Sequence, residues 1–270
     1  MKLYLKNTRL SDTGEMILKE VRILLSGAMG RLGRAVRQAS EGSSEYVIAA
    51  GIDVVPAAEN IPMFTSPAEV NVECDAIIDC SHHTAIAPLL EYAVEKGIPT
   101  VICTTGHTEE ETELIKAAAA RIPVFYSRNM SVGINLLIEL AKKAASVLGD
   151  GYDIEIIEKH HNKKLDAPSG TALMIADAVA DTVPYDAEYT YERQSRREAR
   201  RKNEIGISSI RGGTIVGEHD IIFAGLDEVI TISHSAASRD VFATGALRAA
   251  AYIVGKPAGS YDMSMMIGGK

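Results

Sequence analysis

The stretch VRILLSGAMGRLG, residues 21–33, decides the fold of this chain. Its first five residues form a short, mainly apolar run that ends at a glycine turn, which is typical of a strand buried in a parallel sheet. Residues 30–40 have helical character, so Gly27, Gly30 and Gly33 stand between a strand and a helix. Glycines permit a tight turn and let the backbone approach a pyrophosphate, whose charge the helix N-terminus stabilises. The G-x-x-G-x-x-G spacing therefore indicates a dinucleotide-binding loop, with a plain strand–helix turn as the alternative.

The residues that follow repeat this alternation of strand and helix. Strands are expected at residues 46–52, 75–79, 99–103 and 123–126, and helices at residues 86–96 and 109–120. Such an alternation is typical of βαβ units. We therefore expect an α/β fold with a doubly wound parallel sheet.

An acidic residue follows the second expected strand. Asp53 stands twenty residues after Gly33, where a carboxylate accepts a hydrogen bond from the ribose 2′-hydroxyl of NAD. The same charge repels the 2′-phosphate of NADP, and the next residue, Val54, does not offset it. NADH is therefore the expected donor, with Arg31 as a cation that can support some binding of NADPH.

The pattern changes after Gly151. Following a helix at residues 132–148, we expect strands at residues 153–159, 204–209, 214–223 and 229–233, and helices at residues 171–181 and 242–254. Short turns at residues 211–213 and 226–228 join consecutive strands, which indicates an antiparallel or mixed sheet. A length of 270 residues suits two domains or one large α/β domain.

Composition excludes several classes of protein. With 46% hydrophobic residues and a net charge of −8, the chain resembles a globular enzyme rather than a nucleic-acid-binding protein. The one basic run, residues 193–202, is read as a solvated loop or helix end, with a local anion site as the alternative. No apolar run approaches the ~18 residues of a membrane helix, and residues 1–19 form a short extension that is not a signal peptide. Three cysteines without metal-ligand spacing indicate reduced thiols in the cytoplasm.

The chemistry is concentrated in EKHHNKKLDAPSGTA, residues 158–172. His160 and His161 follow an expected strand, and a third ligand that would make them a metal site is missing. Histidine is a common acid or base because its unperturbed pKa lies near 6.5. A lysine near a histidine, such as Lys164, can have a lowered pKa and donate a proton. The alternative is a group of surface histidines and lysines.

A helix start follows these residues. Pro168 biases its predecessor to an extended conformation, and Ser169 is a good N-cap. Gly170 and Thr171 then present backbone N–H groups with the helix dipole behind them, which suits a carboxylate. Together with the histidines, this helix start indicates a pocket for an anionic substrate.

These residues resemble the signature of the 4-hydroxy-tetrahydrodipicolinate (dihydrodipicolinate) reductase family, E-x-H-H-x-x-K-x-D-A-P-S-G-T-A. Further family motifs follow in the family's order, and the resemblance runs from Val21 to the C-terminus. They are GAMGRLG at 27–33, TTG at 104–106, NMSVGIN at 129–135, VGEH at 216–219 and SR at 238–239.

The resemblance implies an oxidoreductase of lysine and diaminopimelate biosynthesis. NAD(P)H reduces a cyclic dicarboxylate with loss of water, and the product is tetrahydrodipicolinate. A dinucleotide-binding domain, residues 1–130 with 240–270, and an α+β domain for substrate binding and tetramerisation, residues 131–239, are expected. The resemblance implies a homotetramer. From composition and ligand spacing we expect a cytoplasmic protein without a metal site, a nucleic-acid partner or a membrane partner.

The resemblance also assigns roles to residues. His160 and Lys164 are the implied catalytic proton donors, and the implied substrate contacts are His161, Ser169, Gly170 and Thr171. The implied cofactor-binding residues are Gly27, Ala28, Met29, Gly30, Arg31, Leu32, Asp53, Cys103, Thr104, Thr105, Ser127, Arg128, Asn129 and Met130.

Some positions depart from the family pattern. Cys103 stands where glycine is common, and Arg128 where a small residue is common. Residues 81–83, Ser-His-His, are read as a loop near the nicotinamide rather than a metal site. A homoserine-type dehydrogenase or a non-catalytic nicotinamide sensor is the alternative, but neither requires His160, His161 and Lys164 beside Ser169.

Overall fold

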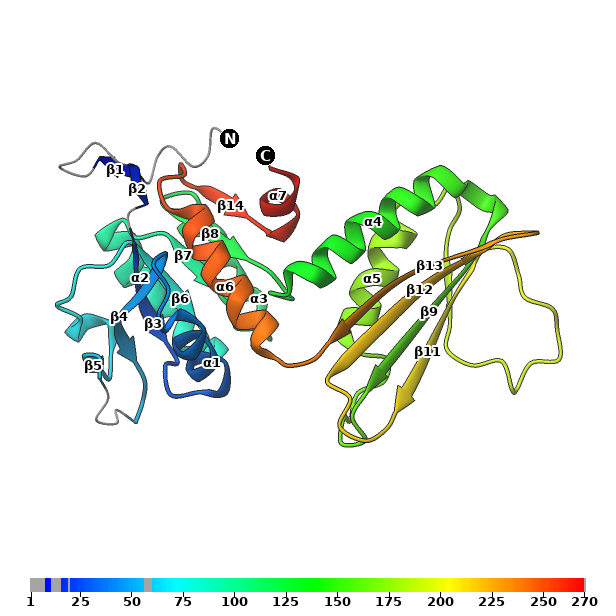
Figure 1. The fold of residues 1–270 in the computed structure, drawn as a ribbon, viewed down its shortest axis with the longest axis horizontal. Helices are drawn as coiled ribbons and strands as arrows, with labels where there is room; N and C mark the ends of the chain where they lie inside the picture. Colours follow the sequence, from blue (N-terminus) through cyan, green and yellow to red (C-terminus); the bar gives the residue numbers. More distant parts are fainter. Residues whose placement is uncertain (1–7, 11–15, 19, 56–59, 270) are drawn as a thin grey trace. The chain divides into compact units, whose positions relative to one another are not determined.

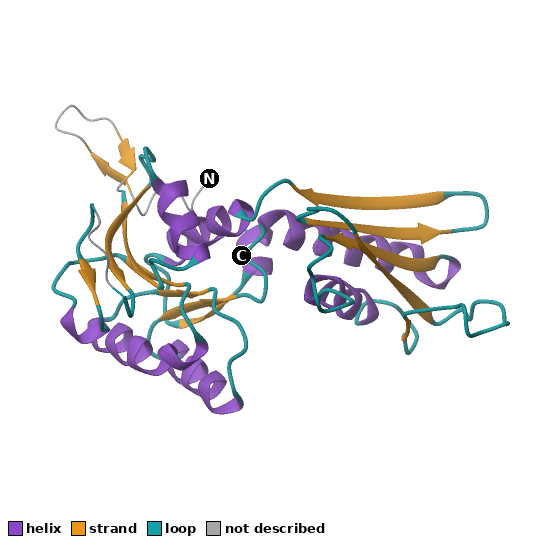
Figure 2. Cartoon of the chain, turned by 90° about the horizontal axis from the view of Figure 1, so that it is seen from below, coloured by secondary structure: helices purple, strands orange, loops and turns teal. Residues whose placement is uncertain are grey.

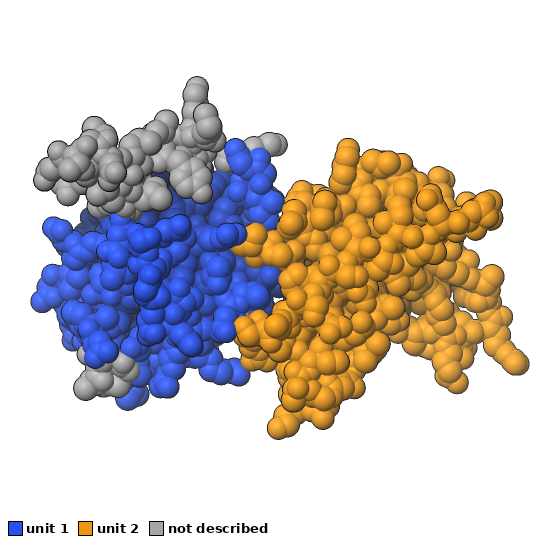
Figure 3. Space-filling model, in the orientation of Figure 1, with its two compact units in different colours: residues 1–131, 240–270 blue, residues 132–239 orange. Residues whose placement is uncertain are grey.

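The computed structural model describes residues 8–10, 16–18, 20–55 and 60–269. The chain forms two compact units (Figure 3). Unit 1 combines Met1–Ser131 with Asp240–Lys270, and unit 2 is Val132–Arg239. No helix in the described ranges is long and apolar enough to cross a membrane.

Unit 1 is built on a seven-stranded sheet in which every pair of neighbours is parallel (Figure 1). The expected α/β fold with a doubly wound parallel sheet is confirmed. In spatial order, its strands are β14 (Gly259–Tyr261), β8 (Pro123–Tyr126), β7 (Thr100–Ile102), β6 (Ala76–Asp79), β3 (Val21–Ser26), β4 (Tyr46–Ile52) and β5 (Met63–Phe64).

Helices cover both faces of this sheet because successive strand residues point to opposite faces. Ile23 and Leu25 of β3 belong to one buried cluster, which includes residues of α1 (Arg31–Ser40) and α6 (Asp240–Ile253). Leu24 belongs to a second cluster, with α2 (Ile86–Lys96) and α3 (Glu109–Ala119). A run that is apolar on both faces therefore explains the central position of β3.

The C-terminal segment completes unit 1. Helix α6 presents small buried residues such as Ala246 and Ala250 to the sheet. A Cβ at Gly245 would stand 1.7 Å from the Met130 carbonyl oxygen, so glycine permits a close approach there. The short helix α7 (Met263–Gly268) follows β14, and neither element was predicted.

Unit 2 contains a five-stranded mixed sheet. Its order is β10 (Glu188–Thr190), β11 (Glu204–Arg211), β9 (Asp153–His160), β12 (Gly217–Ala224) and β13 (Val229–Ala236). The first three strands are parallel, whereas β12 is antiparallel to both β9 and β13. The expected mixed sheet is confirmed.

Two helices, α4 (Val132–Leu148) and α5 (Gly170–Ala180), lie along one face of this sheet (Figure 2). Ile154 and Ile156 of β9 are buried against them, together with Phe223 of β12. Glu155 and Lys159 alternate with these residues and belong to the other face. On that face, Lys159 Nζ lies 3.1 Å from both Glu218 and Asp220.

Some expected boundaries are wrong. Strand β12 begins at Gly217 and not at residue 214, because residues 212–216 form a turn in which Ile215 N–H donates to the Gly212 carbonyl. Short strands β5 and β10 were not predicted, since two or three residues carry too little periodicity. The short strands β1 (Thr8–Leu10) and β2 (Met16–Leu18) pair antiparallel in what was expected to be a plain extension.

Candidate active site

The glycine loop lies at the carboxyl end of β3 in unit 1. Gly27 has φ +75°, and a Cβ there would stand 2.5 Å from the Cys80 carbonyl oxygen. A Cβ at Gly33 would stand 2.1 Å from the Gly27 carbonyl oxygen. Only glycine fits these positions, as expected for a turn that brings backbone close to a phosphate.

Asp53 lies beside this loop. Its Oδ2 accepts a hydrogen bond of 2.9 Å from the Met29 N–H, and its own N–H donates to the Phe64 carbonyl. Arg34 Nε donates to the Met29 carbonyl over 2.9 Å, so a cation from α1 lies at the glycine loop. Arg31 is exposed at the first residue of α1. The carboxylate is thus attached to the loop, as a ribose-binding residue requires.

The other predicted cofactor residues follow neighbouring strands of the same sheet. Cys103 comes after β7, and its N–H donates to the Asp79 carbonyl over 2.9 Å. Ser127 comes after β8, and its Oγ donates to the Asn129 carbonyl over 2.9 Å. Among the described residues, the buried Thr104 Oγ1 and Asp79 Oδ2 have no hydrogen-bond partner. Of the remaining predicted cofactor residues, Thr105 and Arg128 are exposed, Leu32 is partly buried, and Ala28 and Met130 are buried.

The fit to a dinucleotide is therefore good in unit 1. The glycines leave no Cβ in the turn, and the Asp53 carboxylate lies beside it, where a ribose-binding residue is expected. The buried Thr104 hydroxyl, which has no hydrogen-bond partner among the described residues, lies at the carboxyl edge of the sheet. Ligands of open α/β sheets bind at this edge.

In unit 2, His160 is the last residue of β9 and bonds to Glu158 on the same face of the strand. The His160 Nδ1–Glu158 Oε2 distance is 2.5 Å, and the Glu158 side chain is 0% exposed. An ionised carboxylate only accepts hydrogen bonds, so Nδ1 carries the proton that faces Glu158. The other ring nitrogen is left for chemistry.

Arg211, the last residue of β11, binds the same carboxylate through both terminal guanidinium nitrogens. Nη1 lies 2.8 Å from Oε2, and Nη2 lies 2.6 Å from Oε1. Burial alone would raise the pKa of Glu158, but hydrogen bonds from Arg211 and His160 outweigh it and lower the pKa to about 2. Glu158 is therefore an anion under all ordinary conditions.

The predicted carboxylate-binding helix start lies next to this group. Helix α5 begins at Gly170, and Ser169 caps it by accepting the Ala172 N–H at 3.1 Å. The Ser169 N–H donates to Glu158 Oε1 over 3.2 Å. Gly170 is exposed, and a Cβ added to it would meet nothing within 4 Å. The first turn of α5 therefore has open space in front of it, and Thr171, its second residue, is partly buried.

His219 of β12 stands behind Ser169 and His160. Its Nε2 lies 3.3 Å from Ser169 Oγ, and its ring meets the His160 ring edge-on at 5.4 Å. Burial, followed by the nearby His160, lowers the pKa of His219 to about 4. His219 is thus a neutral, buried support of the two predicted site residues.

A pocket of about 390 Å³ lies beside the predicted site in unit 2, and its wall includes two cations, Lys163 and Arg239. Arg239 Nη2 lies 3.4 Å from His161 Nε2. Burial and the charge of Arg239 lower the pKa of His161. Lys164 Nζ lies 2.9 Å from Asp166 Oδ2 and is not in the pocket wall. The wall comprises His161, Asn162, Lys163, Gly213, Thr214, Val216 and Arg239.

The structure adds residues to the set expected from sequence. Glu158 lies inside the signature and Arg211 in an expected turn, and the sequence alone assigns no role to either. His219 and Arg239 occur only as members of longer family motifs. The missing signal is strand pairing, because Arg211 pairs in register with His160 across fifty residues of sequence.

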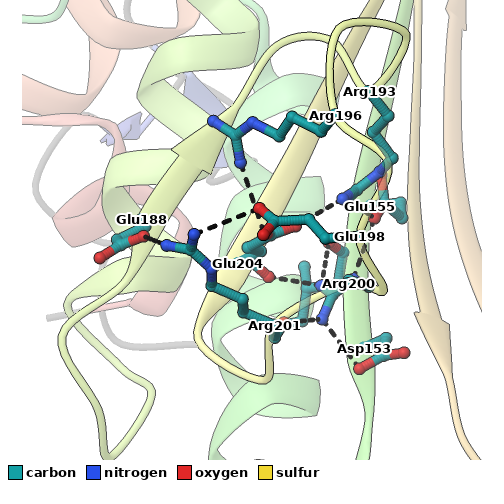
Figure 4. Close-up of polar contacts among 10 residues, drawn as sticks. Asp153, Glu155, Glu188, Arg193, Arg196, Glu198, Arg200, Arg201 and Glu204 are labelled. Atoms are coloured by element: carbon teal, nitrogen blue, oxygen red, sulfur yellow. Dashed lines mark hydrogen bonds and ion pairs between the residues drawn. The ribbon is translucent and has the colours of Figure 1, made fainter.

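The basic run at residues 193–202 is not an open anion site. Arg193 Nη2 lies 2.7 Å from Glu155 Oε1, and Arg200 Nη1 lies 2.8 Å from Asp153 Oδ1 (Figure 4). Arg193 also bonds to Glu204, and Arg201 lies 3.2 Å from Glu198. Acidic residues of the same unit therefore pair with four of the six cations, which favours the reading as a solvated loop.

A parallel sheet with a glycine loop and an acidic residue at the ribose position, joined to a separate unit with an acid–base group, defines a pyridine-nucleotide oxidoreductase. The families described as dihydrodipicolinate reductase, N-terminus and C-terminus, match residues 21–130 and 133–267. The chain belongs to the dihydrodipicolinate reductase family.

Curated relatives agree. A 4-hydroxy-tetrahydrodipicolinate reductase of Caldanaerobacter subterraneus subsp. tengcongensis is 50% identical over 92% of this chain and 98% of its own length. The 4-hydroxy-tetrahydrodipicolinate reductase of Clostridium tetani is 48% identical over 92% of this chain and 97% of its own length. The resemblance seen in the sequence is confirmed.

Solved structures show the same fold. A dipicolinate-bound dihydrodipicolinate reductase from Paenisporosarcina sp. TG-14 has a TM-score of 0.75 at 22% identity and covers 90% of this chain and 97% of that one. A probable dehydrogenase from Thermotoga maritima has a TM-score of 0.59 at 10% identity. The match covers 93% of this chain and 90% of the dehydrogenase.

Proposed function

We propose that this chain reduces 4-hydroxy-tetrahydrodipicolinate to tetrahydrodipicolinate, with loss of water, in lysine and diaminopimelate biosynthesis. The observation that carries the proposal is the cluster of His160, Glu158 and Ser169 at the start of α5. It combines a positioned acid with a helix start suited to a carboxylate. The names of the relatives at 50% and 48% identity support the substrate.

The substrate is a dianion, and unit 2 offers two cationic or dipolar regions to hold it. We assign one carboxylate to the backbone and hydroxyl groups of Ser169, Gly170 and Thr171 at the start of α5. We assign the other to the pocket that contains His161 and Arg239. Dipicolinate, the planar dicarboxylate of the Paenisporosarcina structure, supports this chemistry.

Proton transfer is assigned to His160, with Lys164 as a second donor. His160 holds one proton on Nδ1 toward Glu158, so its Nε2 is the atom that exchanges a proton with the substrate. Lys164 is paired with Asp166 at 2.9 Å, so it must leave this partner before it can donate.

A nicotinamide dinucleotide, when bound, supplies the hydride. We assign its binding to the residues named from the sequence in the loops after β3, β4, β7 and β8 of unit 1. Asp53 favours NADH, and the exposed Arg31 at the start of α1 provides a charge that supports some use of NADPH.

The cofactor proposal predicts a kcat/KM for NADH above that for NADPH. Asp53→Ala should raise kcat/KM for NADPH about tenfold, because a like charge near the 2′-phosphate is removed. Steady-state kinetics with both cofactors measure this ratio. A wild-type preference for NADPH would contradict the assignment of Asp53.

We further propose that units 1 and 2 are the dinucleotide and substrate domains of a cytoplasmic homotetramer. The face of the unit 2 sheet opposite α4 and α5 carries no helix of its own among the described elements. On that face of the edge strand β13, Val229 is 63% exposed. Light scattering of the purified protein measures the assembly, and a monomer at working concentration would contradict it.

The function is tested by coupling the purified chain to the synthase that makes its substrate and following NADH absorbance. Oxidation that requires the synthase product is the expected result. A reductase-dead control is His160→Gln. Oxidation no faster than background at saturating NADH and NADPH would reject the proposed reaction.

A further inference from the structure

Glu158 is surrounded by hydrogen-bond donors alone. His160 Nδ1 and Arg211 Nη1 approach Oε2 at 2.5 and 2.8 Å. Arg211 Nη2 and the Ser169 N–H approach Oε1 at 2.6 and 3.2 Å. The side chain is fully buried, where a charge is stable only if it is paired and hydrogen-bonded. These four donors share the two oxygens of one ionised carboxylate. Because they come from β9, β11 and the start of α5, Glu158 links three separate chain segments.

We infer that Glu158 and Arg211 are a shared positioning pair, which sets the tautomer of His160 and fixes the start of α5 against it. The inference deepens the proposed function, because it rests on His160 as the acid and on Ser169 as part of the carboxylate site. Neither member of the pair needs to touch the substrate. Their effect passes through His160 and Ser169.

The tautomer follows from the geometry. Because Glu158 accepts from Nδ1, the neutral imidazole keeps its lone pair on Nε2, and the imidazolium presents an N–H there. Nε2 faces the backbone of β12, where a Cβ at Gly217 would stand only 3.2 Å away. Glycine at this position keeps the second nitrogen uncrowded.

Arg211 extends the same control to the loop before α5. Its Nη2 donates to the Asp166 carbonyl over 2.8 Å, in addition to its bond to Glu158. The loop that carries His161 and Lys164 is therefore tied to the carboxylate that orients His160. A lysine in place of Arg211 cannot make the two parallel bonds, because an ammonium lacks the planar fork.

The pH behaviour of His160 depends on the charges around it. Glu158 lies on its own strand, Arg211 on β11, His219 on β12, and His161 with Lys164 on the following loop. His219 stays neutral above about pH 4, so it adds no charge in the working range. Glu158 is thus the anion in direct contact with the imidazolium.

The test is Glu158→Gln, which keeps the shape and removes the charge. An amide has only one acceptor oxygen, and it is best placed where Oε1 accepts from Arg211 Nη2 and the Ser169 N–H. The NH₂ then faces His160 Nδ1, which must accept from it, so the ring proton moves to Nε2. The imidazolium loses its anionic partner. We expect kcat/KM to fall roughly 10²-fold or more, and its alkaline limb to move to lower pH because the anionic partner is lost.

The matched control is Glu155→Gln on the same strand, whose carboxylate binds Arg193 and Arg200 outside the site. This variant should keep the wild-type pH profile. If kcat/KM of Glu158→Gln is lower at every pH but both limbs of its pH profile stay at their wild-type positions, the positioning role is wrong. If wild type itself does not turn over the substrate, the proposed function fails instead.

A second readout does not require turnover. Long-range ¹⁵N–¹H spectra of histidine-labelled protein are assigned with His160→Gln and recorded as the pH is raised until the ring signals stop changing. They report which ring nitrogen carries the proton of the neutral imidazole. Wild type should carry it on Nδ1 and Glu158→Gln on Nε2. The same tautomer in both proteins would overturn the inference even if the variant is inactive.

The shared nature of the pair has its own test. Because the Ser169 N–H loses its ionised acceptor, Glu158→Gln should weaken the binding of dipicolinate roughly tenfold in calorimetry. Arg211→Lys should weaken it in the same direction. Unchanged dipicolinate affinity in both variants would confine the pair to His160 and overturn the link to α5.

Discussion

Strand β9 carries two glutamates that bind arginines, and they have opposite surroundings. Glu158 is fully buried on the face covered by α5 and is held by Arg211, His160 and the Ser169 N–H. Glu155, three residues earlier, lies on the other face, has a side chain that is 31% exposed, and binds Arg193 and Arg200. The two pairs look alike as contacts. Because of their surroundings, Glu158 orients His160, whereas Glu155 holds the loop at residues 193–202 against the sheet.

Physical chemistry explains the difference. A buried charge loses its hydration and must recover it from fixed donors, so each donor becomes essential. An exposed pair keeps much of its water and contributes little. An ion pair placed beside a histidine in a buried position is therefore a better sign of function than the six-cation run that the sequence displays at residues 193–202.

The largest contrast between the two faces should appear in turnover. His160→Gln removes the group that Glu158 serves, and kcat should fall by ~10²–10⁴-fold because acid–base assistance is lost. Glu155→Gln should leave kcat within about twofold, as surface substitutions usually do. Stopped-flow or steady-state assays measure both. A His160→Gln effect confined to KM would contradict the acid–base role.

The next largest difference between the two glutamates should appear in the free energy of unfolding. Arg211→Met leaves Glu158 buried without its main partner, which should lower the free energy of unfolding by about 3–5 kcal/mol. Urea denaturation followed by circular dichroism measures this difference. If the free energy of unfolding falls by less than about 1 kcal/mol, the Glu158–Arg211 pair contributes no more than an exposed ion pair, and the two glutamates do not differ.

The pH dependence of stability should differ as well. The folded pKa of Glu158 is lowered from 4.5 to about 2, so its stabilisation is full above pH 4.5 and is lost as the pH falls toward 2. The difference in unfolding free energy between wild type and Glu158→Gln should therefore shrink across this window. Urea titrations at several pH values test it, and a constant difference would show that the charge contributes nothing.

The smallest effect belongs to the exposed pair. Glu155→Gln leaves Arg193 bound to Glu204 and Arg200 bound to Asp153, so the free energy of unfolding should fall by ~0–1 kcal/mol. Because exposed charges are screened, that loss should diminish further at high salt. A larger loss that persists at 1 M salt, where the Debye length is about 3 Å, would show that this face is also a buried electrostatic site.

Much of the fold follows from local pattern. Strand β4, strand β8 and helix α2 have the expected bounds, because each is a single apolar or amphipathic run between turn residues. The mixed sheet was expected from its turns, but its order was not. The parallel pairing of β9 with β11 depends on residues that are fifty positions apart, and no local period encodes it.

The candidate site divides along the same line. His160, Lys164 and Ser169 were found because they lie in one short segment. Arg211 and Arg239 reach that segment only through the sheet and the turn after β13. Residues that support chemistry from a distant strand are predictable only after the strand order is known.

The return of α6 to unit 1 has a consequence for synthesis. All of unit 2 lies between β8 and α6, so a ribosome completes unit 2 before it has made the helix that covers Ile23 and Leu25 of β3. Until residue 253 has emerged, that half of the first-made sheet presents apolar side chains to water. The domain that begins first is therefore the one that finishes last, and nascent chains that stop before α6 are where chaperone binding should concentrate.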